Sequence, residues 1–544
     1  MSQSRGPRIS WFFALVLCAA AFPACGSDYR KPRHVVLIVV DTLRADHLST
    51  YGYRRPTSPE LDKLAAEGAV FEHAVSQCSW TQPSMVSMMT GAYLADELRE
   101  IPESKTTLAS VFQKEGFATA AFIYNNVLND KNGFQRGFDV FDFEDPPYQP
   151  ITKISDWITA NKGKQTFTFI HLNEAHDPYE TPDEFDHFVK EKDSLTSSRL
   201  DWYREVSKQH GLGAFEENVR QINEKIGGYD DDVRYSDDHI GKILSAIRAS
   251  GEWEQTAIVI AADHGEGLWT RFDYMTGPRL KSKQAGQPPT LLNSLKMDHG
   301  NQVGFELVHV PLIFVAPGMP KGVRVQPWVE NVDIGPTLLE LCDLPRPANM
   351  QGSSLLPLWS QPEVVAHQKR GSFTHTRYVS SFIDQNGFQL IQPTPRGECE
   401  FDLEVELYDL NKDPEARVNL AASEKSRVEG MSKDIAARMK LGMTQAEIAH
   451  GESEDERARL NLIGYVDREM VDLVDKKYAA MTTEQLLEAL ADPKIANCLE
   501  RIRAALALKA RALTPDEKSA VKALRVREVS AAIRTVFDET LAKE

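Results

Sequence analysis

Short apolar runs recur along the chain, and most of them end at a polar residue. The run from His34 to Val40 is unbroken and rich in β-branched residues, which is typical of a parallel strand buried on both faces. Further strand-like runs, separated in part by helical patterns, cover residues 118–123, 167–170, 256–262 and 311–316. This alternation predicts an α/β fold with a mostly parallel central sheet and helices on both faces.

Helix signals divide the chain further. Pro59 and Gly68 mark the two ends of one helix, because proline suits a first helical turn and glycine a C-terminal end. Other helical patterns cover residues 107–114 and 230–248, and residues 406–414 read as a strand running into a turn. Beyond about residue 419 the composition turns to Ala, Leu, Glu and Arg, with helix starts at Thr483 and Thr514. We therefore expect a main domain over 33–425 that ends in a small strand-containing subdomain, and a helical extension over 426–544.

Residues 269–295 lose all periodicity and collect glycine, proline and basic residues. This composition predicts a long loop inside the main domain. Because the loop follows one of the predicted strands, we expect it near the strand ends, as either a lid or an insertion.

The N-terminus has the pattern of an export signal. Arg5 and Arg8 precede an apolar run, residues 11–22, that is too short to span a bilayer. The run leads into Cys25 in a context similar to a bacterial lipoprotein cleavage site, although a buried N-terminal helix is the structural alternative. We predict that residues 1–25 direct export, and that the protein is periplasmic or associated with the cell envelope. A membrane tether through lipidated Cys25 is one form of that prediction, and an unanchored protein is the other.

Charge narrows the class of ligand. The formal net charge is −17, from 79 acidic and 62 basic residues, which argues against general affinity for nucleic acid. A divalent metal ion fits this balance better than a phosphate backbone does.

Polar side chains stand at the ends of the predicted strands. Asp41, Asn125, His171 and the pair Asp263-His264 each lie at or just past such an end. Ligands of open α/β sheets bind at the carboxyl edge of the strands, so these side chains predict a site there. Asp263, His264 and Asp41 offer the carboxylates and imidazole that a dication needs.

Thr81 is the candidate nucleophile. It precedes a helical stretch, residues 85–90, in which Pro83 fits the first turn and Gly91 the end. A threonine in this place is either a helix cap or a nucleophile held where the helix dipole favours an anion. If Thr81 approaches the same ion as Asp41 and Asp263, the metal would lower the pKa of its hydroxyl and make it reactive at neutral pH.

A set of motifs then resembles one family. They are Val40-Asp41-Thr42-Leu43-Arg44-Ala45-Asp46-His47-Leu48, Thr57-Ser58-Pro59, Thr81-Gln82-Pro83-Ser84, His176-Asp177-Pro178-Tyr179, Asp263-His264-Gly265-Glu266, His299-Gly300, Leu407-Tyr408-Asp409-Leu410 and Leu462-Ile463-Gly464-Tyr465-Val466. In this order they are similar to the sulfatase family of the alkaline phosphatase superfamily, including bacterial sulfatase-like lipoproteins. The resemblance covers roughly residues 33–467 and implies the alkaline phosphatase or sulfatase-like fold.

Three departures from the family pattern point to its Thr-nucleophile branch. Typical sulfatases convert a Cys or Ser to formylglycine in a Cys-x-Pro-Ser-Arg motif, whereas this chain has Thr81 and has Met85 in place of the arginine. No formylglycine is expected at Thr81. Thr42 and His264 stand where sulfatases tend to have Asp and Asn, and Asn125 stands near the position of a Lys-x-His segment. Relatives with a threonine there are nucleotide pyrophosphatase-like phosphodiesterases and phosphoethanolamine or phosphoglycerol transferases.

The resemblance implies a role for each matched residue. Asp41, Thr81, Asp263 and His264 would be the metal ligands, with Thr81 as the nucleophile. His176 and His299 would contact the transferred group, protonate the leaving group or hold a second ion. His171 and Asn125 join them as candidate substrate-binding residues, with a structural role as the alternative for each. Glu266 would orient His264 or cap a helix, and Arg44, Asp46 and Asp237 would form structural ion pairs.

The sequence thus predicts a metal-dependent, sulfatase-like hydrolase of small sulfuric or phosphoric esters that forms a covalent intermediate on Thr81. The ion would be zinc, manganese, calcium or magnesium. Two alternatives remain: a phosphoethanolamine- or phosphoglycerol-type transferase on the same fold, and a non-catalytic binding protein with a degenerate site.

Overall fold

The structure is a computed structural model of the chain. It describes residues 29–143, 151–191, 193–273, 290–360, 370–394, 397, 403–444, 481–491, 504–505, 507–509, 511–527, 537 and 540–541. The predicted export segment with Cys25, and the motif at 462–466, lie outside these residues. Within the described part, none of the helices combines the length and the apolar character needed to cross a bilayer.

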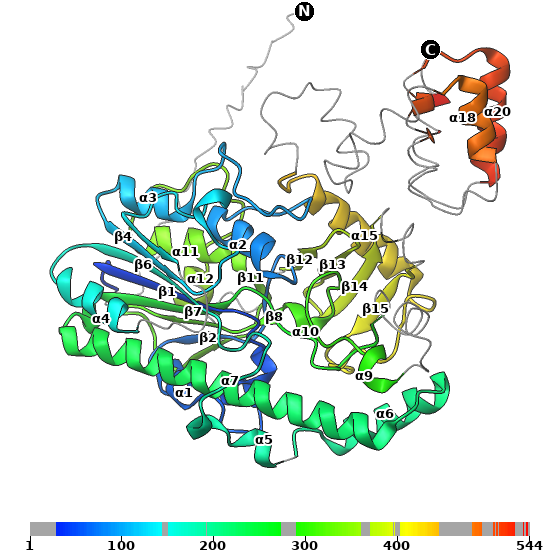
Figure 1. Cartoon of the computed structure of the whole chain (residues 1–544). Coiled ribbons are helices and arrows are strands. Elements are labelled where there is room, and N and C mark those ends of the chain that lie inside the picture. Colours follow the sequence, from blue (N-terminus) through cyan, green and yellow to red (C-terminus); the bar gives the residue numbers. More distant parts are fainter. Residues whose placement is uncertain are drawn as a thin grey trace, which may run out of the picture.

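The core of the molecule is an eight-stranded sheet with the order β10-β2-β9-β7-β1-β6-β4-β5 (Figure 1). Its strands are β1 (His34–Val40), β2 (Ala69–Phe71), β4 (Ala118–Ile123), β5 (Val140–Phe143), β6 (Thr166–Leu172), β7 (Thr256–Ala262), β9 (Leu312–Val315) and β10 (Val323–Val325). The strands from β7 to β5 are all parallel, whereas β9 runs antiparallel to both of its neighbours. Every residue of β1, β6 and β7 is buried, as the unbroken apolar run of β1 predicts.

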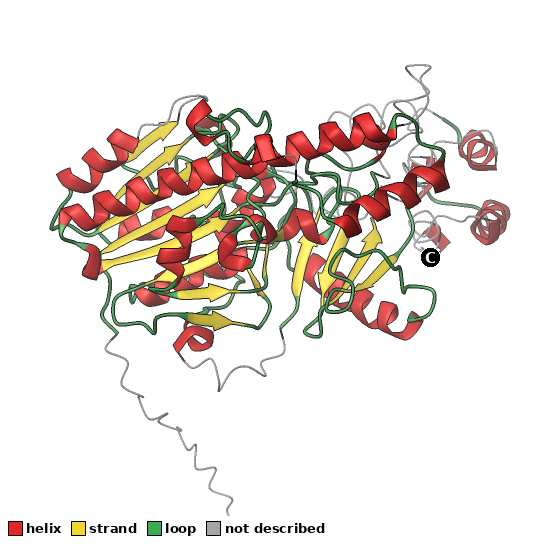
Figure 2. Cartoon of the chain, turned by 90° about the horizontal axis from the view of Figure 1, so that it is seen from below, coloured by secondary structure: helices red, strands yellow, loops and turns green. Residues whose placement is uncertain are grey.

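Helices cover both faces of this sheet, which confirms the predicted fold class. The helices of the main domain are α1 (Pro59–Ala65), α2 (Thr81–Thr90), α3 (Leu108–Lys114), α4 (Ile151–Ala160), α5 (Phe188–Glu191), α6 (Ser197–His210), α7 (Phe215–Ser250), α9 (Leu291–Ser294), α10 (Phe305–Val308), α11 (Ile334–Leu341) and α12 (Leu356–Ser360). Helices α1 and α4 pack against α7 on one face, and α2, α3, α11 and α12 lie on the other (Figures 1 and 2).

Helix α7 is much longer than the sequence predicts, because it begins at Phe215 instead of residue 230. The first half of the helix was not predicted because the glycine pair Gly227-Gly228 interrupts the helical pattern, and glycine lowers helix propensity. The structure gives Gly227 a packing reason: a Cβ there would lie 2.7 Å from the Cα of Val189 in the chain that crosses the helix. The helix therefore continues through the glycines, and α5 rests on its surface.

A small antiparallel sheet follows the main sheet in sequence. It consists of β12 (Ser372–His375), β13 (Val379–Ile383), β14 (Phe388–Pro393) and β15 (Glu406–Asp409), and β15 lies where a strand was predicted. Helix α15 (Lys425–Met439) packs on it through Met431 and Ile435. Three short strands, β3 (Ala74–Val75), β8 (His309–Val310) and β11 (Val329–Glu330), form a further sheet.

The chain that leaves α15 returns to the main domain. Met443 pairs with the backbone of Tyr93 and Ala95, just beyond the end of α2. Helices α18 (Thr483–Ala491) and α20 (Pro515–Arg527) begin where helix starts were predicted, and α18 and α20 share a hydrophobic cluster. The domain boundaries proposed at residues 25 and 425 stay predictions.

The predicted loop over 269–295 is packed at both of its ends. Trp269 is buried and its backbone carbonyl accepts a hydrogen bond from the hydroxyl of Tyr203. Leu295 is buried as well and pairs with Phe272, so the two ends lie side by side. Its middle, residues 274–289, lies outside the described residues, and the choice between lid and insertion stays open.

We expect Asp232→Asn to stabilise the protein, and to do so more strongly at pH 8 than at pH 5. Burial, with the carboxylates of Glu174 and Asp231 adding to it, raises the pKa of Asp232 to about 9. The folded state thus holds a proton that the unfolded state, with a pKa of about 3.9, has lost, and stability falls by up to about 1.4 kcal/mol per pH unit between those values. Asparagine removes this loss. Thermal unfolding at the two pH values measures it, with the exposed Asp201→Asn as control; an equal shift at both would contradict the assignment.

Candidate active site

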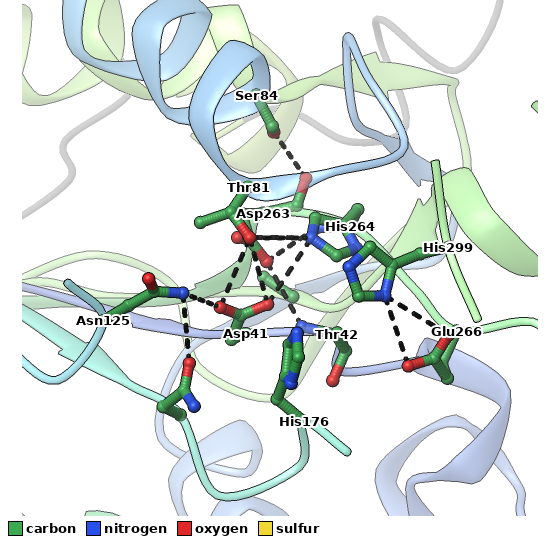
Figure 3. A network of polar contacts seen from close by, with 12 residues as sticks. Asp41, Thr42, Thr81, Ser84, Asn125, His176, Asp263, His264, Glu266 and His299 are labelled. Carbon is green, nitrogen blue, oxygen red and sulfur yellow. Dashed lines mark hydrogen bonds and ion pairs between the residues drawn. The ribbon is translucent and has the colours of Figure 1, made fainter. Parts of the chain in front are cut away.

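The strand-end residues predicted from the sequence meet at one edge of the sheet. Val40 lies opposite Leu172 of β6 and Ala262 of β7, so the residues that follow β1 and β7, Asp41 and Asp263, emerge side by side. His171 precedes the end of β6, and Asn125 follows β4. Figure 3 shows Asp41, Asp263 and Asn125 converging below the first turn of α2.

Thr81 points into this group from the other side. It is the first residue of α2, whereas the sequence places it just ahead of the helix, and the side chain of Trp80 does not cap the helix. The Thr81 hydroxyl lies 3.4 Å from Oδ2 of Asp41 and 3.2 Å from Nε2 of His264. Its contacts are therefore with the strand-end side chains.

The tautomer of His264 follows from its contacts. Its Nδ1 lies 2.9 Å from the carbonyl oxygen of Gly265, and because a carbonyl only accepts, Nδ1 carries the proton. Burial lowers the pKa of His264 despite the neighbouring Asp263. The neutral ring thus turns the lone pair of Nε2 toward Thr81 and toward Asp41, whose Oδ1 is 3.4 Å away.

Asp41, His171 and Asp263 form a group that fits a divalent ion. One donor atom of each lies within 4.8 Å of the others, and all three side chains are fully buried. Both ring nitrogens of His171 and Oδ2 of Asp263 lack a hydrogen-bond partner, an arrangement that is costly unless something else binds them. Carboxylate and imidazole donors of this kind suit zinc or manganese.

Asn125 orients one of the carboxylates, whereas the side chain of Thr42 orients neither. The side-chain amide of Asn125 donates to Oδ2 of Asp41 at 2.7 Å and to Asn173 at 3.2 Å, so its anionic partner in the structure is Asp41. Thr42 adopts a φ of 56°, and its hydroxyl donates to the carbonyl of Ala175. The Thr42 side chain thus points away from the carboxylates. Thr42 holds the position at which the family resemblance would place a second aspartate.

We expect Asn125→Ala to weaken divalent-metal affinity about 10- to 100-fold, since partners that orient ligands contribute on that scale. The change removes the 2.7 Å bond that holds the Asp41 carboxylate. Isothermal titration with zinc and manganese measures the affinity. Asn129→Ala is the matched control, because the Asn129 side chain contacts only nearby backbone in the same loop. Equal affinities for the two variants would contradict this role.

His299 and His176 lie beside the buried group. The ring of His299 is 4.4 Å from that of His264 and 5.1 Å from that of His176, measured between centroids. Nδ1 of His299 donates to Glu266 at 3.3 Å. Glu266 therefore orients His299, and the prediction that it orients His264 or caps a helix is wrong. Burial opposes protonation of His299, but Glu266 outweighs it and raises the pKa of His299 to about 9.

Two serine hydroxyls support the site without having been predicted to do so. The hydroxyls of Ser76 and Ser84 both donate to the backbone carbonyl of Asp263, which fixes the turn after β7. Ser84 stands in the quoted Thr81 motif, whereas Ser76 gave no signal. Met85, at the position of the usual arginine, is fully buried in the core. The predicted structural ion pairs of Arg44 with Asp46, and of Asp237 with Arg234, are present.

Comparisons with known proteins agree with this fold, and the family matches and relatives identify the protein as a hydrolase that acts on ester bonds. The family model described as Sulfatase matches residues 33–344, more than half of the chain, and one described as N-sulphoglucosamine sulphohydrolase, C-terminal, matches residues 305–446. The chain belongs to the sulfatase family.

Individual relatives are distant. Delta 4,5-hexuronate-2-O-sulfatase of Bacteroides thetaiotaomicron is 24% identical over 76% of this chain and 88% of its own length. Arylsulfatase K of Bos taurus is 21% identical over 76% of this chain and 84% of its own length. The crystal structure of the phosphonate monoester hydrolase of Agrobacterium radiobacter superimposes with a TM-score of 0.56 at 17% identity, over 75% of this chain and 95% of the other. These relatives carry the names of hydrolases, so the transferase and the non-catalytic alternatives are not favoured.

Proposed function

We propose that the protein hydrolyses small sulfuric or phosphoric esters through a covalent adduct on Thr81, with the help of a divalent metal ion. The observation that carries the proposal is the position of the Thr81 hydroxyl, 3.2 Å from Nε2 of His264 and 3.4 Å from Oδ2 of Asp41. The family's usual nucleophile is formylglycine, and a threonine cannot form it. A hydroxyl nucleophile is the chemistry that remains for this position.

Asp41, Asp263, His264 and Thr81 would hold the ion, and His171 is a fifth candidate ligand. The support is the donor set itself: two carboxylates and two imidazoles, with the orphaned buried atoms of Asp263 and His171 among them. When bound, the ion would lower the pKa of the Thr81 hydroxyl, so that its proton is lost at neutral pH.

The remaining groups of the chain account for the other steps. The Thr81 oxygen forms a bond to the sulfur or phosphorus atom while the bond from that atom to the alcohol oxygen breaks. His299, held by Glu266, donates the proton that the departing alcohol needs. In the second half-reaction a water molecule gives a proton back to His299 while its oxygen bonds to the sulfur or phosphorus. The bond to Thr81 breaks, and the threonine oxygen leaves in the deprotonated form in which it attacked. His176, beside His299, contacts the transferred group.

The class of ester stays open between sulfate and phosphate. The relatives named above include a sulfatase of a hexuronate and a phosphonate monoester hydrolase, so both kinds of centre occur among similar proteins. A screen of the purified protein with zinc, manganese, calcium or magnesium against aryl sulfates, phosphate monoesters and phosphodiesters tests the proposal. Turnover of one ester class, with one sulfuryl or phosphoryl group gained by the peptide that contains Thr81, is the expected result. No turnover of any ester with any of the metals would refute it.

Export belongs to the same proposal, because the pattern of residues 1–25 supports secretion with or without a lipid on Cys25. Expression of the full chain in bacteria, with fractionation and mass analysis of the mature N-terminus, distinguishes the two forms. If the protein is tethered, we expect a lipid-modified Cys25 in the membrane fraction. The Cys25→Ala protein should then carry no lipid and leave the membrane fraction.

A further inference from the structure

Arg99 is an unneutralised cation beside the candidate nucleophile. Its guanidinium carbon lies 5.3 Å from the centre of the Trp80 ring, and Trp80 directly precedes Thr81. The Arg99 side chain is exposed, and among the described residues no carboxylate lies within ion-pair distance of it. The backbone of Arg99 is held by helix α2, because the side-chain amide of Gln82 donates to the Arg99 carbonyl at 3.3 Å.

Trp80 lies next to Thr81 in the sequence and packs against the turn that contains His299 and Gly300. The amide of Gly300 donates to the carbonyl of Ser79 at 2.7 Å, which joins the two segments. A Cβ built on Gly300 would lie 3.7 Å from the Cβ of Trp80, so the indole runs along this turn directly after His299. The partly exposed Trp80 therefore lies beside both segments that carry the candidate catalytic residues Thr81 and His299.

Other arginines that stack on tryptophan in the described structure are neutralised. Arg248 lies 3.3 Å from the centre of the Trp253 ring and pairs with Glu67. Arg417 stacks on Trp202 and pairs with Glu415. Arg99 lies farther from its ring, at 5.3 Å from the centre of Trp80, and has no carboxylate partner among the described residues. Its ring is the one that directly precedes Thr81.

One arginine of the small-sheet region contacts the segment of Arg99 and is already paired there. Arg377 forms an ion pair with Glu97 at 2.9 Å, and Glu97 belongs to the segment that ends at Arg99. Arg99, by contrast, has no carboxylate partner among the described residues and is free to bind an anionic ligand. A guanidinium binds a carboxylate, sulfate or phosphate through paired hydrogen bonds, while an indole face stacks on a ring.

We propose that Trp80 and Arg99 form a specificity site for the alcohol part of the ester, in which Trp80 stacks on a ring and Arg99 binds a second anionic group on that ring. The inference rests on the proposed function, since it takes the reacting ester to lie at Thr81. It deepens that function by naming the substrate class: ring alcohols that carry an additional carboxylate, sulfate or phosphate.

Matched ester pairs test the assignment. Phenyl sulfate and carboxyphenyl sulfate, and the corresponding phosphates, differ only in the second anionic group. We expect Arg99→Ala to lower kcat/KM for the carboxylated ester about tenfold or more, in line with loss of a charged hydrogen bond, and to change it less than about twofold for the plain ester. Arg99→Lys should retain part of the preference. Arg248→Ala, which breaks a similar ring contact at η5 (Trp253–Gln255), ahead of β7, is the control.

Measurements of ester affinity without turnover test the specificity site separately from the proposed catalytic function. Titration of the same esters into the Thr81→Ala protein, with and without Arg99→Ala, reports affinity without turnover. A preference for the carboxylated ester that disappears with Arg99 supports the specificity site even if the wild-type protein cleaves neither ester, which would count against the proposed function alone. Equal losses for both esters, or no loss for either, would overturn the assignment of Arg99.

Discussion

Replacing Thr81 by alanine is expected to lower kcat for the ester that the protein cleaves by roughly 10⁴-fold or more, as loss of a catalytic nucleophile does in other hydrolases. The substitution removes the hydroxyl that contacts both Asp41 and His264. Thr81→Ser should keep a measurable share of the activity, because it keeps the hydroxyl. Steady-state kinetics of the three proteins, with mass analysis for the covalent adduct, gives the comparison.

The control for this experiment is Thr159→Ala, which removes a threonine hydroxyl from the exposed side of helix α4. It should leave kcat unchanged. Melting temperatures of all variants show whether a loss of activity comes from unfolding. If Thr81→Ala retained full activity while folded, another group would have to be the nucleophile.

Asp263→Asn is expected to abolish metal binding and with it the stabilisation that the ion brings. A ligand present at about 100 times its dissociation constant stabilises a protein by about 2.7 kcal/mol, so zinc or manganese should raise the melting temperature of the wild-type protein. In Asp263→Asn that increase should vanish, because the carboxylate beside His171 and His264 is lost. Elemental analysis of the dialysed proteins reports the number of ions bound.

Asp142→Asn serves as the matched control for this change. Asp142 lies on the edge strand β5 and pairs with Lys153 at 2.9 Å, away from the strand ends of β1 and β7. Its metal response should equal that of the wild-type protein. Should the wild-type melting temperature not respond to any divalent ion, the proposed metal dependence would fail.

Strands β1, β4, β6, β7 and β9 were predictable because they are buried on both faces and therefore read as apolar runs. The same burial made the strand ends visible, so that Asp41, Asn125 and the Asp263-His264 pair were identified before the structure. Strands β2, β5 and β10 were missed, because they are short, and β5 and β10 are also partly exposed. Helix α7 was predicted too short because Gly227 interrupts its helical pattern. The glycine is needed where the segment at Val189 crosses the helix closely, and a contact distant in sequence leaves no periodic signal.

Side-chain pairing was predicted least well. His171 was assigned to substrate binding from its place at a strand end, but the structure puts it among the carboxylates of Asp41 and Asp263. Glu266 is close in sequence to His264 and yet contacts His299, more than thirty residues away. Which of two histidines a carboxylate meets depends on how the turns after β7 fold, and neither composition nor spacing encodes that.

The register of β1, β6 and β7 has a consequence for how the enzyme is made. Asp41 leaves the ribosome first, His171 follows only after another 130 positions, and Asp263 comes later still. Because parallel strands pair only when the intervening crossovers have formed, such long-range contacts assemble late in folding. A nascent or unfolded chain therefore carries every catalytic group but no active site. A chain that crosses a membrane in the unfolded state would therefore not hydrolyse esters in the compartment that it leaves.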